Sequence, residues 1–226
     1  MKTGSKTGVV TTRDIPSVAV LSFGDHRIPR PLRGLPTHHA AGRADSDAVD
    51  GAIGRYRRLV VVGADADLAA VLTRLLRADR LDVEVAYLPR RRTRATRIYR
   101  VPTGRRAARH ARHGSARRVT LIRDETGSVV VGRAGWLPGD DGRLLHGEAV
   151  VDDTALFDGD VAGVDVEPTL AVPGLRARVN GRRWVAGRAA QLGSTGVTVL
   201  RDGVPAPRTS RRSTFYRNLE GWLLIR

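Results

Sequence analysis

Three short segments of the sequence carry residues whose types and order suit phosphate chemistry. The first is the turn Gly63-Ala64-Asp65-Ala66-Asp67, the second is Pro102-Thr103-Gly104, and the third is Asp202-Gly203. Glycine lets an anion approach the backbone closely, and the free N–H groups at the start of a helix attract one. A carboxylate in such a place can act as a general base or bind a hard cation. The elements around these segments decide whether they meet in space.

The first segment lies between two clear predicted elements. Residues 59–62 form an unbroken apolar run that is typical of a buried strand. From Asp67 to Arg77 apolar residues recur at helical spacing, which predicts an amphipathic helix, with Leu68, Val71, Leu72, Leu75 and Leu76 on its apolar face. Asp65 or Asp67 can cap that helix, because a carboxylate accepts hydrogen bonds from its first N–H groups. Ligands of open α/β sheets bind at turns of this kind.

The rest of the N-terminal half completes an α/β pattern. We predict strands at 18–23 and 82–87, a short helix at 47–56 and a second helix at 105–112. The segment from Ile28 to Arg43 contains three prolines and reads as a loop. His38 and His39 could suggest a metal site, but no cysteine or carboxylate stands at ligand spacing beside them, which favours a solvated pair in a loop.

From residue 119 onward the pattern changes to short strands separated by glycine-containing turns. Asn180-Gly181 predicts a type I′ hairpin, and frequent turns favour an antiparallel sandwich or barrel. We expect a disordered N-terminus at 1–15, an α/β domain at 16–115 and a β-sandwich domain at 116–226. The predicted strands of the second domain are 119–123, 129–134, 146–151, 161–167, 175–179, 197–201 and 222–225.

Composition excludes several kinds of chemistry. The chain has no cysteine, which excludes disulfides and thiolate metal sites. Its two lysines are Lys2 and Lys6, so Schiff-base chemistry and a Walker-type lysine are absent from the body of the chain. Residues 1–12 lack the apolar core of a signal peptide, and no apolar run is long enough for a membrane span. We therefore expect a cytoplasmic protein.

The three segments resemble motifs of the diacylglycerol kinase and sphingosine kinase family of lipid kinases. In that family a strand leads into Gly-Gly-Asp-Gly-Thr; here Gly63 and Asp65 match, while alanines replace two glycines and Asp67 replaces the threonine. Residues 102–109 echo the family's Pro-x-Gly-Thr-Gly-Asn-Asp-Phe-Ala-Arg helix start without its Asn-Asp pair. Asp202-Gly203-Val204 stands where the family has Asp-Gly-Glu.

The resemblance implies a fold and a reaction. The fold is a diacylglycerol kinase/NAD kinase-like α/β domain followed by an all-β sandwich, which residues 222–225 would close. The reaction is transfer of the ATP γ-phosphate to a lipid hydroxyl with Mg²⁺, with Asp202 as the candidate base. Gly63, Asp65, Thr103 and Gly104 would bind the nucleotide, and Asp65 would also lie near the metal. The substitutions in the motifs make a non-catalytic, nucleotide- or anionic-lipid-binding relative (a pseudokinase) the alternative.

The formal net charge of +16 has two interpretations. Arginine-rich codon usage alone explains it equally well, whereas a functional interpretation is a surface for anionic lipid, phosphate or nucleic acid. A lipid patch would allow peripheral contact with an anionic membrane. A nucleic-acid binder would use the segments 90–118 and 208–217. The candidate anion or lipid patch comprises Arg90, Arg91, Arg92, Arg94, Arg105, Arg211 and Arg212.

Overall fold

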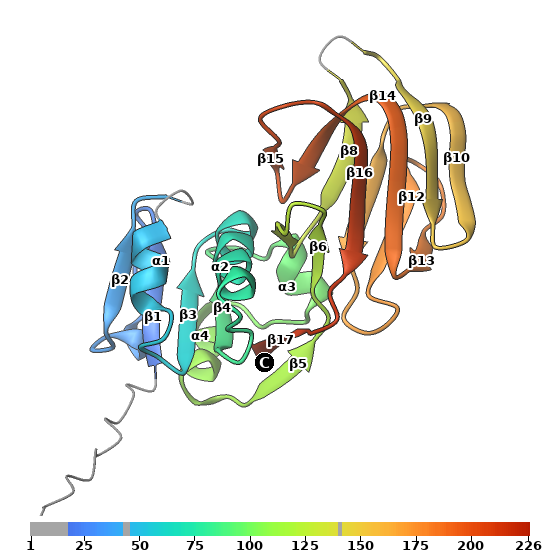
Figure 1. Ribbon diagram of the computed structural model, residues 1–226. Coiled ribbons are helices and arrows are strands. Elements are labelled where there is room, and N and C mark those ends of the chain that lie inside the picture. The colour runs from blue at the N-terminus through green and yellow to red at the C-terminus, as the bar shows by residue number, and fades with distance from the viewer. Residues whose placement is uncertain (1–17, 43–45, 140–141) are drawn as a thin grey trace, which may run out of the picture.

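The computed structural model describes residues 18–42, 46–139 and 142–226, which form two β-sheets joined side by side (Figure 1). The predicted disordered segment 1–15 lies outside these residues. The first sheet carries the helices, and the second consists of antiparallel strands. The predicted fold class, an α/β part followed by an all-β part, is confirmed.

The first sheet has the strand order β2-β1-β3-β4-β17-β5. All neighbouring strands in it run parallel except β17 and β5, which are antiparallel. Helices α1 and α2 pack on one face and α4 on the other. The elements are β1 (Val18–Phe23), the 3₁₀ helix η1 (Arg30–Leu32), β2 (Thr37–Ala40), α1 (Ser46–Ala52), β3 (Arg58–Val62), α2 (Asp65–Arg77), β4 (Glu84–Leu88), α3 (Arg94–Ile98), α4 (Gly104–His113), β5 (Ala116–Val119) and β17 (Trp222–Ile225).

Strand β3 shows why this part folds as a layered α/β structure. Successive side chains of a strand point to opposite faces. Leu59 and Val61 accordingly enter the core shared with α1 and α2, whereas Val60 and Val62 enter the core shared with α4. Both faces of the strand are buried, as the unbroken apolar run predicts.

The second sheet has eleven strands in the described residues and wraps round a separate core. Its main order is β13-β12-β11-β8-β14-β16-β6-β7, with β9, β10 and β15 attached through β14. The fully buried rings of Trp136 and Phe215 pack against each other in this core at a tilt of 30°, with centroids 5.7 Å apart. The strands are β6 (Ile122–Asp124), β7 (Val129–Val130), β8 (Ala134–Pro138), β9 (Leu145–Val151), β10 (Thr154–Val161), β11 (Val164–Pro168), β12 (Leu175–Val179), β13 (Val185–Gly187), β14 (Ala189–Arg201), β15 (Val204–Pro205) and β16 (Ser210–Arg217).

The last strand does not close the second sheet, contrary to the expectation. β17 returns to the first sheet, where it lies between β4 and β5. The predicted strand 119–123 is also divided: β5 belongs to the first sheet and β6 to the second. Residues 116–226 therefore do not form one sandwich. An apolar run such as 222–225 predicts a strand, but it does not specify the neighbour with which that strand pairs.

Two local predictions need correction. The segment 28–43, predicted as a loop, contains η1 and the edge strand β2, and His38 lies in β2 with its ring 3.2 Å from the Tyr56 hydroxyl. Near residue 180 the chain does form a hairpin, in which Leu175 pairs with Gly187. The type I′ turn is wrong, because it needs a positive φ at two residues and only Gly181 has one, at +81°.

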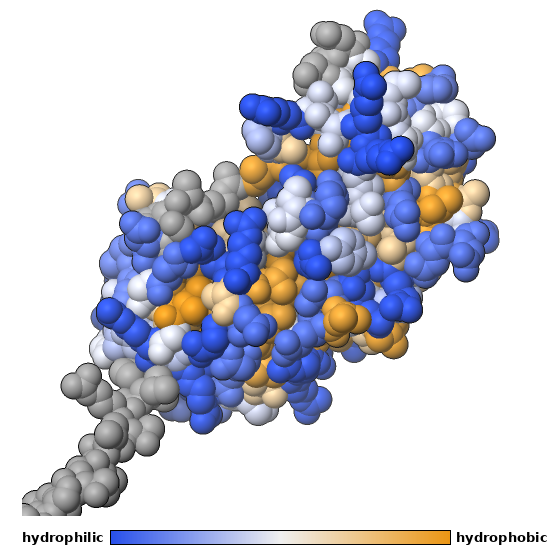
Figure 2. All heavy atoms as spheres, in the orientation of Figure 1, coloured by the Kyte–Doolittle hydropathy of each residue, from blue (hydrophilic) through white to orange (hydrophobic). Residues whose placement is uncertain are grey.

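On the face shown in Figure 2, hydrophilic side chains predominate and apolar ones appear in separate patches among them. None of the helices in the described ranges is long and apolar enough to cross a lipid bilayer.

Candidate functional site

Asp65 is the first residue of α2 and is held from two other elements. The hydroxyl of Tyr87, at the end of β4, donates to its Oδ1 at 2.8 Å. The backbone N–H of Ala95, at the start of α3, donates to its Oδ2 at 3.1 Å. Burial and the nearby Asp65 charge raise the pKa of Tyr87, so this phenol remains a proton donor at neutral pH. The Asp65 carboxylate is thereby fixed at the carboxyl ends of the strands.

Asp202 lies in the tight turn between β14 and β15, where its φ is +47°. Three consecutive backbone N–H groups donate to its carboxylate: Val131 at 3.0 Å, Gly132 at 2.7 Å and Arg133 at 2.9 Å. Burial raises the pKa of Asp202 to about 6, the three N–H bonds oppose that rise, and the Asp65 charge adds to it. A carboxylate has about four acceptor positions, so one remains for a proton.

Gly132 brings the two aspartates together. A Cβ at this position would stand 2.7 Å from Oδ2 of Asp65 and 2.9 Å from Oδ1 of Asp202. The two carboxylates therefore approach a common point, although Asp65 begins α2 on the first sheet and Asp202 lies in a turn of the second. Only a residue without a side chain leaves room for this approach. The structure thus joins two of the three segments that the sequence singles out.

The turn between β3 and α2 is occupied by its own side chain. Oδ2 of Asp67 accepts a hydrogen bond from the Ala64 N–H at 2.7 Å, and a Cβ on Gly63 would stand 2.6 Å from the same oxygen. Asp67 therefore caps α2, whereas Asp65 points toward Tyr87 and Ala95. The Ala64 N–H, which would otherwise face a bound anion, already has a carboxylate partner.

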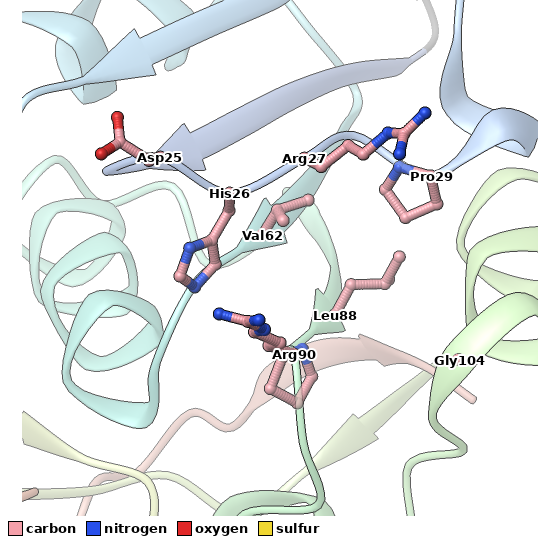
Figure 3. A pocket seen from close by; sticks show the side chains of 9 residues that line it. Asp25, His26, Arg27, Pro29, Val62, Leu88, Arg90 and Gly104 are labelled. Atoms are coloured by element: carbon pink, nitrogen blue, oxygen red, sulfur yellow. The ribbon is translucent and has the colours of Figure 1, made fainter.

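A pocket of about 370 Å³ opens beside this turn, at the carboxyl ends of β1, β3 and β4 (Figure 3). Its walls are apolar on the sheet side, and Arg27, His26 and Arg90 supply its basic groups. His26 and Arg90 point toward one another across it. Gly104, the first residue of α4, completes the lining, which comprises Asp25, His26, Arg27, Pro29, Val62, Leu88, Pro89, Arg90 and Gly104.

The remaining predicted site residues are distributed as follows. Thr103 is exposed at the N-cap of α4 and makes no capping hydrogen bond through its side chain. Arg91 and Arg92 are exposed beyond β4, and Arg105 lines a groove next to the pocket. Arg94 is bound to the buried carboxylate of Glu167. Arg211 and Arg212 lie on β16 in the other sheet, so the arginines named from the sequence do not form one patch.

Sequence reasoning missed several residues of this region, namely His26, Arg27, Tyr87 and Gly132. Tyr87 ends an alternating strand directly before Leu88-Pro89, which is a place where a side chain reaches the carboxyl edge of the sheet. Gly132 lies within the predicted strand 129–134, and a glycine inside a strand pattern signals a close approach. These two residues carried a signal in the sequence.

Few side chains at this site could act as ligands of a metal ion. In the described ranges no cluster of three or more histidine and carboxylate side chains could hold an ion. Asp65 and Asp202 provide two carboxylates at one point. Mg²⁺ commonly takes one or two carboxylates and completes its shell with substrate phosphates and water. Asp65 therefore fits as one ligand of a magnesium ion that arrives with a nucleotide, and Asp202 lies beside it.

Comparison with known proteins identifies the fold. No protein-family model and no curated protein sequence matches the chain. The crystal structure of a diacylglycerol kinase from Bacillus anthracis strain Sterne is similar, with a TM-score of 0.70, 12% identity, and coverage of 94% of this chain and 97% of that one. An NAD kinase from Archaeoglobus fulgidus in complex with ATP gives a TM-score of 0.62, 11% identity and coverage of 92% and 93%. The chain therefore has the diacylglycerol kinase/NAD kinase-like fold.

Proposed function

We propose that the protein is a diacylglycerol kinase-like enzyme that binds ATP in the pocket at the carboxyl ends of β1, β3 and β4 and phosphorylates a lipid hydroxyl. The observation that carries the proposal is the meeting of Asp65 and Asp202 at Gly132. The fold supports it, because the similar NAD kinase structure was solved in complex with ATP.

In this reaction Asp202 is the general base. The lipid hydroxyl gives its proton to the Asp202 carboxylate, its oxygen forms the new bond to the γ-phosphorus, and the bond from that phosphorus to ADP breaks. A pKa of about 6 leaves Asp202 ionised at neutral pH and close enough to that pH to exchange a proton. Mg²⁺, when bound with ATP, neutralises charge on the phosphates. Asp65, held by Tyr87 and Ala95, orients the site beside them.

The same site also supports the non-catalytic alternative. Because the Ala64 N–H is bound to the Asp67 carboxylate, that amide is not free to bind the phosphates. Val204 also replaces a carboxylate that the family resemblance implies. A protein that binds ATP without transferring phosphate would agree with these two features. We therefore expect slow turnover from the proposed kinase.

The test is transfer of labelled γ-phosphate from ATP to diacylglycerol in mixed micelles, measured over a range of pH. The rate should rise with pH through about 6 and then level off, because Asp202 must lose its proton to act as a base. Asp202→Asn should lower the rate by at least about a hundredfold. The exposed Asp153→Asn serves as a matched control and should leave it unchanged.

Two outcomes would decide against the kinase. Saturable ATP binding without transfer to the lipid would select the non-catalytic alternative. A transfer rate that survives Asp202→Asn would remove Asp202 as the base.

A further inference from the structure

A groove of about 460 Å³ adjoins the nucleotide pocket and is lined by five arginines. We call it the arginine groove; its cationic residues are Arg27, Arg30, Arg33, Arg105 and Arg109. The segment 27–33 forms one wall and helix α4 the other. Arg27 and Pro29 line both the groove and the pocket, so the two spaces are neighbours.

The groove has a rigid base. Leu32 of η1 is fully buried and belongs to the same apolar cluster as Ala107, Ala108 and Ala111 of α4. Nη1 of Arg112 donates to the carbonyl oxygen of Pro31 at 3.1 Å, which ties α4 to the opposite wall. Prolines restrict the backbone of that wall further. The arginines are therefore carried at fixed positions rather than on a loose loop.

The charges of the groove are unpaired, whereas several arginines elsewhere in the described residues are bound to carboxylates. Arg94, Arg133 and Arg176 all bind the carboxylate of Glu167, and Arg178 and Arg201 bind aspartates. In the groove no arginine side chain makes an ion pair or a hydrogen bond with another described residue. No carboxylate is among the residues that line it. Five like charges in one concavity repel one another unless an anion joins them.

The side chains that line the groove indicate which class of anion it binds. Guanidinium groups bind phosphate oxygens in pairs, and each phosphate group can carry up to two charges. No aromatic side chain lines the groove, although proteins that bind single-stranded nucleic acid usually stack bases on such side chains. The groove also shares Arg27 and Pro29 with the pocket.

We propose that the arginine groove binds a second ligand carrying several phosphate charges, next to the nucleotide. Its source is either a free phosphate compound or the headgroup of an anionic lipid. The neighbouring nucleotide rests on the proposed function, but binding in the groove does not, because Arg33 and Arg109 line the groove and not the pocket.

The test uses the full chain and the double variant Arg33→Glu/Arg109→Glu. Both side chains are exposed and unpaired, so the variant should keep the same unfolding midpoint. Arg182→Glu/Arg183→Glu makes the same change of charge at exposed residues of the second sheet and is the control. One arm measures binding of inorganic pyrophosphate by calorimetry. The other arm measures how much of the protein sediments with vesicles of phosphatidylglycerol and phosphatidylcholine, and compares this amount with that for vesicles of phosphatidylcholine alone.

We expect the groove variant to weaken binding by at least about tenfold while the control variant binds like the wild type. If the groove variant binds pyrophosphate more weakly, the ligand is a free phosphate compound. If the variant is weakened only in its binding to the anionic vesicles, the ligand is a lipid headgroup. Equal losses in both variants would overturn the proposal, since they would reflect net charge only. Failure of the wild type to bind either probe at low salt would also overturn it, even if the protein binds a single-stranded oligonucleotide titrated in parallel.

Discussion

Glu167→Ala should lower the free energy of unfolding by about 3 kcal/mol or more. Glu167 is fully buried on β11, and its carboxylate binds Arg94, Arg133 and Arg176, with the Arg176 Nη2 at 2.8 Å from Oε2. Alanine would leave three guanidinium groups without their shared anion. Arg94 belongs to α3, so this carboxylate also ties the second sheet to the first.

Urea unfolding followed by tryptophan fluorescence measures this loss. Glu148→Ala is the matched control, because Glu148 is exposed on β9 and makes no ion pair with a described residue. The control should change the free energy of unfolding by no more than about 0.5 kcal/mol. A Glu167→Ala protein as stable as the control would show that the buried carboxylate does not hold the two sheets together.

Gly132→Ala should lower the proposed phosphoryl transfer by about a hundredfold, because a displacement near 1 Å at a reacting centre has that effect. The new Cβ would meet one oxygen of Asp65 and one of Asp202, at 2.7 and 2.9 Å, and also the Cβ of Arg94 at 3.3 Å. The carboxylates must then move apart. Crowding of this kind costs about 1–3 kcal/mol of stability.

Initial rates and urea unfolding, measured on the same preparation, separate the two effects. Gly196→Ala is the control, since a Cβ at Gly196 would meet no atom within 4 Å. The stability result stands whether or not the protein is catalytic. Unchanged stability in Gly132→Ala would mean that the aspartates do not converge at residue 132.

The sequence predicts the individual elements of this fold better than their arrangement. The pattern of apolar residues predicts β3 and α2. Strand β3 is apolar throughout because both of its faces are buried, and α2 has one apolar stripe because only one of its faces is buried. The apolar run at 222–225 predicts a strand, but it does not predict that this strand joins the first sheet. The pairing of β17 with β4 and β5 depends on contacts between residues far apart in the sequence. Strand β2 lies at the edge of the first sheet, follows a proline and contains two histidines, so it has no clear apolar pattern.

For the candidate site too, the sequence predicts individual residues but not their arrangement. Asp65 and Asp202 are recognisable because each sits in a turn after an apolar run. Their convergence at Gly132 depends on how the two sheets meet, which no local pattern encodes. The arginines are too numerous for the sequence to tell which are paired. Only the structure separates Arg94, which binds Glu167, from Arg105, which lines the arginine groove.

Calorimetric titration with ATP, with and without Mg²⁺, tests most directly whether the pocket beside Asp65 holds a nucleotide. We predict saturable binding that Mg²⁺ strengthens and that Arg90→Glu weakens, because Arg90 lines the pocket. Asp67→Thr should tighten it, since the Ala64 N–H would then be free for phosphate. The absence of heat at any workable concentration, or binding that none of these changes alters, would contradict a nucleotide site at the carboxyl ends of β1, β3 and β4.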